Sequence, residues 1–256
     1  PKTSSAASDV YKRQLSLWMR QPLSNHYDNQ FDAPLSWNQD ETDVLVMCDK
    51  VLVPWERIFV KDDAIQAREI YFKTPAHCYG NHQSNVRYWS KMELIVGLCY
   101  KVAKATGADE VPAVRETLGK MSALESTLSG MIYGQIENAE NWPENFKTFN
   151  RRIMYAALNF CTDNYSMIID ELRTLCGGGV FQMPASIKVM KNKELLNDFE
   201  TYFQTPQMNA LDRMKLFKLA WDVVGSEFAG RQLQYEKFYA GASSVSYTHL
   251  TLPTRS

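Results

Sequence analysis

Between residues 154 and 175 the sequence places apolar side chains in alternating steps of four and three. This spacing puts all of them on one face of an α-helix of about six turns. So long an apolar face needs other helices to cover it, and the Cys-Gly-Gly-Gly run at 176–179 ends the helix. The chain is therefore expected to fold as a helical bundle. The seven positions are Met154, Leu158, Cys161, Tyr165, Ile168, Leu172 and Leu175.

Three further segments show one-sided apolar patterns with helical spacing. The first begins near His82 and ends at Gly107, which suits a left-handed cap. The second begins at Pro112 and continues to about residue 140. The third is expected to run unbroken over 210–239. Together with the helix over 154–175, these segments predict an antiparallel bundle in a mainly α protein.

The segment 43–60 has a different pattern. Two apolar, β-branched runs, interrupted by Asp49-Lys50 and by Pro54, predict a pair of strands. We therefore expect residues 15–61 to be the end of a β-domain and residues 62–243 to form the helical bundle.

The two ends of the chain fit neither part. Residues 1–14 and 244–256 lack apolar periodicity and resemble translated sequencing-adapter tails rather than a signal peptide. We expect both tails to be non-native, and the remainder to be a piece of a longer protein.

Charge and cysteine usage narrow the class of protein. The net charge of −1 over 256 residues suggests no nucleic acid as partner, and the absence of an apolar run of eighteen residues argues against a membrane span. Five widely spaced cysteines, without a Cys-x-x-Cys pair, favour neither a disulfide framework nor a zinc site. Four of them lie in or beside apolar runs. We expect buried free thiols and a cytoplasmic location.

Pattern alone leaves several readings of the polar residues open. The glycines at 177–179 either cap a helix or allow close approach of a cofactor, and no nucleotide-binding βαβ unit precedes them. His82, Gln83 and Arg87, at a predicted helix start, are metal ligands, contacts to an anionic cofactor, or solvated residues. Small residues at 225–226 indicate close helix packing or the edge of a ligand.

Four stretches together resemble one family. They are DAPLSWNQDETDVLVMCDKVLVPWERIF, NHQSNVRYWSKMELIVGL, LCGGGVFQMPAS and LFKLAWDVVGSEFAGRQLQYEKFYAG. They are similar to the oxygenase component of two-component 4-hydroxyphenylacetate 3-monooxygenases, whose fold resembles acyl-CoA dehydrogenases. The resemblance covers nearly all of residues 32–241 and implies a C-terminal fragment of a protein about twice as long.

The resemblance also implies a reaction. A separate flavin reductase would supply reduced FAD, and the oxygenase would use dioxygen to hydroxylate a phenol ortho to its hydroxyl group. The substrate would be similar to 4-hydroxyphenylacetate, the assembly a homotetramer, and the catalytic residues would lie in the missing N-terminal half. We therefore expect the fragment alone to be inactive, and we name no catalytic residue and no metal ligand within it.

The same resemblance selects cofactor contacts. His82, Gln83 and Arg87 would line the FAD site, and the turn Gly225, Ser226, Glu227 and Phe228 would meet the flavin. Gly177 and Gly178 would approach it from a neighbouring subunit, and Ser36 is a further candidate. The full set is His82, Gln83, Arg87, Gly225, Ser226, Glu227, Phe228, Gly177, Gly178 and Ser36.

Two alternatives remain beside the hydroxylase. One is a flavin-dependent acyl-CoA dehydratase or dehydrogenase, because 4-hydroxybutyryl-CoA dehydratase belongs to the same superfamily and binds an iron-sulfur cluster through a histidine at this place and a cysteine seven residues later. Here His82 is followed at that distance by Trp89, which cannot supply the thiolate. The other alternative is a non-catalytic helical oligomerisation module.

Overall fold

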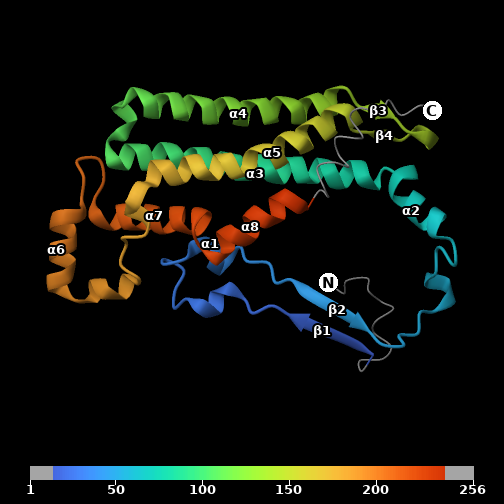
Figure 1. Cartoon of the computed structure of the whole chain (residues 1–256), viewed down its shortest axis with the longest axis horizontal. Coiled ribbons are helices and arrows are strands. Elements are labelled where there is room, and N and C mark those ends of the chain that lie inside the picture. Colours follow the sequence, from blue (N-terminus) through green and yellow to red (C-terminus); the bar gives the residue numbers. More distant parts are fainter. Residues whose placement is uncertain (1–13, 240–256) are drawn as a thin grey trace.

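A computed structural model describes residues 14–239 of the chain. Long helices dominate it and lie side by side, with a small two-stranded sheet at one side (Figure 1). The predicted tails at 1–14 and 244–256 lie outside the described residues, except for Gln14. The helices are α1 (Pro34–Asn38), α2 (Ala64–Lys73), α3 (Ala76–Thr106), α4 (Pro112–Glu137), α5 (Arg151–Cys176), α6 (Lys193–Phe203), α7 (Ala210–Val224) and α8 (Glu227–Phe238).

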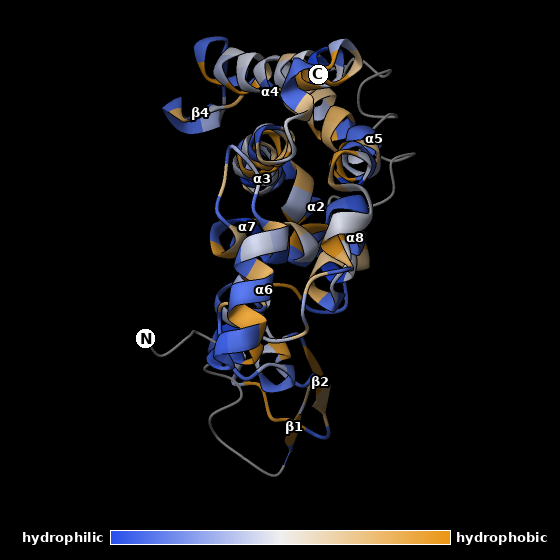
Figure 2. Cartoon of the chain, turned by 90° about the vertical axis from the view of Figure 1, so that its left-hand side faces the viewer, coloured by the Kyte–Doolittle hydropathy of each residue, from blue (hydrophilic) through white to orange (hydrophobic). Residues whose placement is uncertain are grey.

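The hydrophobic core lies between α3, α4, α5 and α7. Figure 2, which looks along the long helices, shows α3 with α4, α5 and α7 around it, and the buried apolar residues of these helices form one core cluster. Met92 of α3, Leu128 of α4 and Leu172 of α5 are fully buried, as is Phe217 of α7, at 1% exposure. The predicted seam over 154–175 is confirmed as the α5 face that packs into this core.

Helix α3 begins earlier than the sequence predicts. Its first residue is Ala76, preceded by Pro75, so the helix is 31 residues long and His82 comes six residues after its start. The prediction that the helix starts at His82, Gln83 and Arg87 is therefore wrong. The apolar periodicity is weak over the first turns of α3, where buried side chains are polar, and this hid the true start.

The predicted single helix over 210–239 is also wrong, because it is two helices. Helix α7 ends at Val224 and α8 begins at Glu227, with Gly225 and Ser226 between them. Ser226 starts α8 by accepting a hydrogen bond from the Ala229 amide. Gly225 and Ser226, the small residues noted in the sequence, thus mark a helix boundary.

The strand prediction over 43–60 is half correct. Strand β2 (Val44–Cys48) is present, and it pairs antiparallel with β1 (Leu15–Met19), so that Trp18 lies opposite Leu45. No second strand follows within 49–60, where Lys50 has a φ of 51° and Pro54 precedes a short 3₁₀ turn. The minor elements are β3 (Glu140–Asn141), β4 (Lys147–Thr148) and the 3₁₀ turns Leu23–His26, Trp55–Arg57, Ala108–Glu110, Pro143–Asn145, Gly177–Val180 and Ile187–Lys191.

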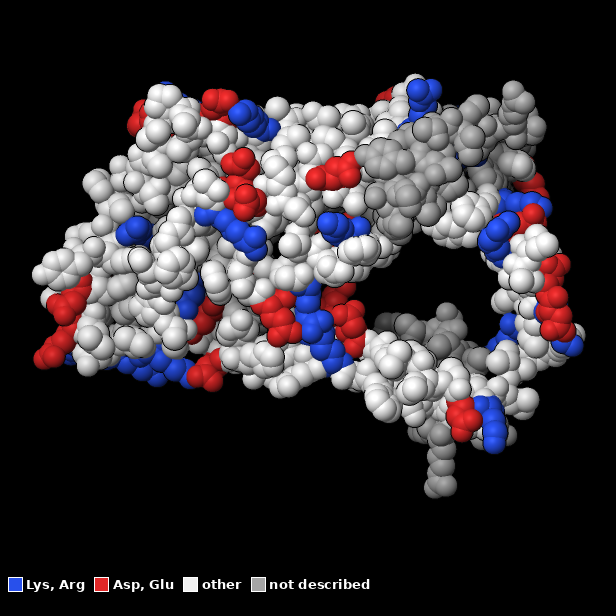
Figure 3. All heavy atoms as spheres, in the orientation of Figure 1, with Lys and Arg blue, Asp and Glu red and all other residues white. Residues whose placement is uncertain are grey.

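In the space-filling view, the segment that joins β2 to α2 forms an arch separated from the helices by an opening (Figure 3). Acidic and basic side chains are interspersed over this face and gather near its middle. No described helix is long and apolar enough to cross a membrane. Four of the five cysteines are buried, as predicted, Cys48 is exposed, and all are free thiols.

Candidate functional site

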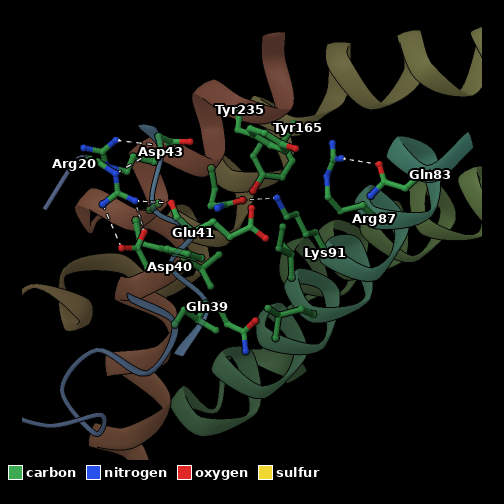
Figure 4. A pocket seen from close by; sticks show the side chains of 18 residues that line it. Arg20, Gln39, Asp40, Glu41, Asp43, Gln83, Arg87, Lys91, Tyr165 and Tyr235 are labelled. Carbon is green, nitrogen blue, oxygen red and sulfur yellow. Dashed lines mark hydrogen bonds and ion pairs between the residues drawn. The ribbon is translucent and has the colours of Figure 1, made fainter. Parts of the chain in front are cut away.

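A cavity of ≈ 510 Å³ lies between α1, α3 and α8 and the chain around β1 and β2. Charged side chains face one another across it from two sides (Figure 4). Part of its lining is apolar, contributed by Leu35, Leu94, Ile95, Tyr165, Val223 and Phe228. A space with apolar walls and a few converging charged groups is typical of a small-molecule site.

The α3 side of the cavity is built on a four-residue spacing. Gln83, Arg87 and Lys91 follow one another at this interval, so they share one face of the helix. Arg87 donates two hydrogen bonds to Glu236 of α8, at 3.1 and 3.0 Å, and one to Gln83 at 3.3 Å. Its guanidinium also lies over the ring of Tyr235, with 4.7 Å to the centroid.

Glu236 is the shared partner of both cations on this wall. Its side chain is 3% exposed, and besides the hydrogen bonds from Arg87 it accepts one from Lys91. Burial lowers the pKa of Lys91, and the attraction of Glu236 only partly opposes this. Burial is the largest effect on the pKa of Arg87 and would lower it, but the hydrogen bonds to Glu236 together with the attraction of its charge outweigh burial and raise the pKa. The wall therefore favours the charged form of Arg87 and disfavours that of Lys91 relative to a lysine in water.

The facing wall carries a second ion-pair network. Arg20, at the end of β1, donates to Asp40 at 2.7 and 3.2 Å, and Asp40 also accepts from the Leu23 amide at 2.8 Å. Burial would raise the pKa of Asp40, but the hydrogen bonds from Arg20 and Leu23 outweigh it and lower the pKa. Asp43 lies 3.6 Å from Arg20 and 3.9 Å from Arg231 of α8. This network links the side of the cavity formed around β1 and β2 to α8.

The junction of α7 and α8 borders the cavity between these walls. Phe228 lines it, and Glu227 pairs at 2.7 Å with Arg231, which also lines it. Ser226 does not line it, because its hydroxyl caps α8 and donates to the Asp222 carbonyl at 3.0 Å. A side chain at Gly225 would come within 2.4 Å of the Trp221 ring, so only glycine fits there without a shift.

His82 points away from the cavity. Its Nδ1 atom lies 2.8 Å from Oε1 of Gln135 on α4, and its ring stacks on Phe149 with 3.6 Å between centroids. Gln83 and Arg87 line the cavity, but His82 is not among the lining residues. The hundred-degree turn between successive helical residues separates it from its neighbours.

Three other predicted contacts also lie off this cavity. Gly177, with a φ of 54°, ends α5, and the adjacent Gly178 packs near Phe181. Ser36 is fully buried and donates its hydroxyl to Asp222 at 2.5 Å. The structure therefore brings together Gln83, Arg87 and Phe228, with Glu227 and Ser226 behind them.

Residues 67–252 match the protein family described as HpaB, 4-hydroxyphenylacetate 3-hydroxylase, C terminal. The chain belongs to this family. The matched range ends inside the segment 244–256. The family had been expected from the four resembling stretches, and this expectation is confirmed.

Curated relatives and solved structures agree with this family. The chain is 30% identical over 215 residues to the 4-hydroxyphenylacetate 3-monooxygenase oxygenase component of Thermus thermophilus, covering 84% of this chain and 44% of that protein. It is 28% identical over 229 residues to the pyoverdin chromophore biosynthetic protein PvcC of Pseudomonas aeruginosa, covering 89% and 45%. The chain therefore spans about half the length of the curated relatives it matches.

A crystal structure of HpaB, the oxygenase component of 4-hydroxyphenylacetate 3-monooxygenase, in complex with FAD and 4-hydroxyphenylacetate, superimposes with a TM-score of 0.87 at 30% identity. The match covers 93% of this chain and 49% of that one. A 4-hydroxybutyryl-CoA dehydratase from N. maritimus superimposes with a TM-score of 0.80 at 14% identity, which shows a shared fold only. The expected mainly α, acyl-CoA dehydrogenase-like fold is confirmed.

Several cavity residues escaped the sequence reasoning. Lys91 could have been found, because it continues the four-residue spacing of Gln83 and Arg87. Arg20 and Asp40 gave no such signal, since only the pairing of β1 with β2 brings the start of the chain to α8. Glu236 gave no signal in the sequence, where it is one of several polar residues of a helix, although its side chain is buried.

Proposed function

We propose that this chain is the C-terminal part of a longer FADH₂-dependent aromatic hydroxylase, and that its cavity is one side of the flavin site. Family membership supports the reaction class, and the single observation that supports the site is the convergence of Gln83, Arg87 and Phe228 on one cavity. The related HpaB binds FAD and 4-hydroxyphenylacetate. We infer a phenolic substrate similar to 4-hydroxyphenylacetate, hydroxylated ortho to its hydroxyl group.

The lining residues fit a flavin nucleotide. Apolar side chains such as Ile95, Val223 and Phe228 offer a surface for a planar ring, while Arg87 and Lys91 offer cationic donors for its anionic parts. When bound, reduced FAD supplies the activation of dioxygen. The residues of this chain would bind and orient the nucleotide, and their apolar wall would exclude water from it.

The other predicted contact residues have different roles in this proposal. Glu227 would act through its ion pair with Arg231, and Ser226 and Gly225 would shape the turn that presents Phe228. We retain Gly177 and Gly178 as contacts from a neighbouring subunit. Catalytic residues are expected outside this chain.

The proposal includes partners. A separate flavin reductase would deliver reduced FAD, since relatives are named as oxygenase components. We further propose a homotetramer built through the helical part, residues 62–243, with residues 15–61 completing a β-domain supplied mostly by the rest of the protein. The buried free thiols favour a cytoplasmic location.

The dehydratase alternative receives less support from the local geometry. Trp89 occupies the place where a cluster ligand would be needed, and its indole nitrogen donates to Glu125 at 2.5 Å. His82 is engaged by Gln135 and Phe149.

The decisive experiment starts from the full coding sequence that contains this chain. The full-length protein, supplied with a flavin reductase, NADH, FAD and 4-hydroxyphenylacetate, is expected to form the catechol, measured by chromatography. This chain alone is expected to form none, and omission of the reductase serves as the control. Absence of hydroxylation by the full-length protein with every phenol tested would contradict the proposal and favour the oligomerisation module. Catechol formation by this chain alone would contradict its status as an inactive part.

A further inference from the structure

Asp222 is a buried carboxylate on α7 that caps the N-terminus of another helix, α1. It lies in the last turn of α7 and is 1% exposed. One oxygen accepts the backbone N–H groups of Leu35 and Ser36 at 2.6 and 2.7 Å, and the other accepts the Ser36 hydroxyl at 2.5 Å. Helix α1 has no capping side chain of its own, since its first flanking residue is Ala33. Asp222 therefore supplies the N-terminal cap of α1 from 186 residues away.

The same residue also holds the start of α8. Its backbone carbonyl accepts the Ser226 hydroxyl at 3.0 Å, and Ser226 caps α8 by accepting the Ala229 amide at 3.1 Å. Two serines, one from each helix, thus bond to Asp222. The ends of α1 and α8 are fixed relative to each other through this one residue, and all three helices meet at this place (Figure 1).

Both helices provide lining for the cavity. Leu35 comes from α1 and Gln39 directly follows it, and Phe228 and Ala229 come from the first turn of α8, whereas Asp222 does not line the cavity. Its carboxylate accepts three hydrogen bonds within the protein and is not among the lining residues. Asp222 therefore acts on a bound molecule by placing these two walls and not by direct contact.

We propose that Asp222 is a positioning residue of the cavity, which couples α1 to the first turn of α8 so that Leu35, Gln39 and Phe228 form one binding surface. The inference rests on the proposed function where it concerns flavin. It also assigns Ser36 a supporting place behind the wall, in contact with Asp222 instead of the cofactor.

Three variants of this chain test the role of Asp222. Asp222→Ala removes all three acceptor contacts. Asp222→Asn keeps three hydrogen bonds in a similar geometry. Its amide oxygen can accept the N–H groups of Leu35 and Ser36, and its NH₂ group can donate to the Ser36 hydroxyl oxygen. Glu140→Ala is the matched control, since Glu140 accepts the Arg151 amide at 2.9 Å at the start of α5, away from the cavity. Binding of oxidised FAD is followed by fluorescence, amide exchange by mass spectrometry, and stability by thermal unfolding.

Asp222→Ala is expected to weaken FAD binding about tenfold or more and to speed amide exchange in residues 34–43, whereas residues 227–229, held through the backbone carbonyl of residue 222, should exchange as in wild type. Asp222→Asn is expected to stay within about threefold of wild type, because the contacts and not the charge matter. Glu140→Ala is expected to lower the melting temperature without changing FAD affinity. Loss of affinity in Asp222→Asn equal to that in Asp222→Ala would overturn the positioning role, as would an equal loss in Glu140→Ala.

Unchanged amide exchange over 34–43 in Asp222→Ala would overturn the inference directly. If wild type bound no FAD, the proposed flavin site would fail for this chain, and the exchange pattern would still decide whether Asp222 fixes the two walls. The two failures are therefore distinguishable.

Discussion

At the scale of single residues, Glu236 decides the electrostatics of the cavity. One nearly buried carboxylate holds Arg87 and Lys91, and both cations lose solvation when they line the cavity. Removing one partner of such a cluster leaves uncompensated charge, which costs more than the pair itself contributes. Lys91 is the member whose proton is held least firmly, because burial lowers its pKa.

Glu236→Gln is expected to lower the free energy of unfolding by about 3 kcal/mol, because it leaves Arg87 and Lys91 without their shared anion. Urea unfolding at neutral pH measures this. Glu227→Gln is the control, since its ion pair with Arg231 is half-exposed and should cost less than about 1 kcal/mol. Equal losses of unfolding free energy in the two variants would contradict the role of Glu236 as the shared partner of Arg87 and Lys91.

The pH dependence of stability follows from Lys91. Its folded pKa lies below the unfolded value of 10.5, so between these two values the unfolded chain binds more protons than the folded chain. The stability of wild type relative to Lys91→Met is therefore expected to rise with pH across this window and to stay flat below it. Urea unfolding of both proteins over a pH series measures the difference. A relative stability that fell as pH rose in this window would contradict the lowered pKa.

At the scale of elements, the residues at which helices begin and end determine the geometry of the cavity more than the lengths of the helices do. The break between α7 and α8 turns the chain so that Phe228 faces the cavity, and it depends on Gly225 and the Ser226 cap. Sequence reasoning recognised small residues at a costly position but extended the helix through them, because the apolar stripe continues on both sides.

Gly225→Ala tests the break. Its new methyl group would meet the Trp221 ring, so we expect a loss of about 2 kcal/mol in unfolding free energy. Gly230→Ala, inside α8 with open space around it, is the matched control and should add up to about 1 kcal/mol. Thermal and urea unfolding of both variants measure the contrast. Stabilisation by both substitutions would show that α7 and α8 do not need this turn.

At the scale of the whole molecule, the described surface leaves much apolar area uncovered. Trp18 and Leu45, paired across β1 and β2, are 65% and 60% exposed, and Tyr133 of α4 is 58% exposed. Apolar surface on both the hairpin and the helices suits a chain that spans about half of its relatives' length and packs against further protein. The proposed tetramer and the rest of the β-domain are the partners we expect there.

Leu172→Glu tests the bundle and its assembly together. Leu172 is fully buried in the core, so a charge there is expected to unfold the helices, measured by circular dichroism, and to abolish the tetramer of the full-length protein, measured by sedimentation. Met167→Glu, on the same helix but 40% exposed, is the control and should keep the fold. A well-folded wild-type monomer of the full-length protein would contradict the proposed tetramer.

The sequence alone determined the bundle class, the buried face of α5 and the family, because helical periodicity and capping residues act over a few neighbouring positions, although it misplaced the start of α3 and missed the break between α7 and α8. The seam that contains Leu172 and the end of α3 at Gly107 were predicted for this reason. Only the tertiary structure decided the cavity. Arg20, Glu236 and Asp222 gain their roles from partners far away in the chain, and a one-residue step along α3 turns His82 away while Gln83 faces inward. Local pattern carries no information on which distant segments meet, so the contacts that build the site appeared only once the chain was folded.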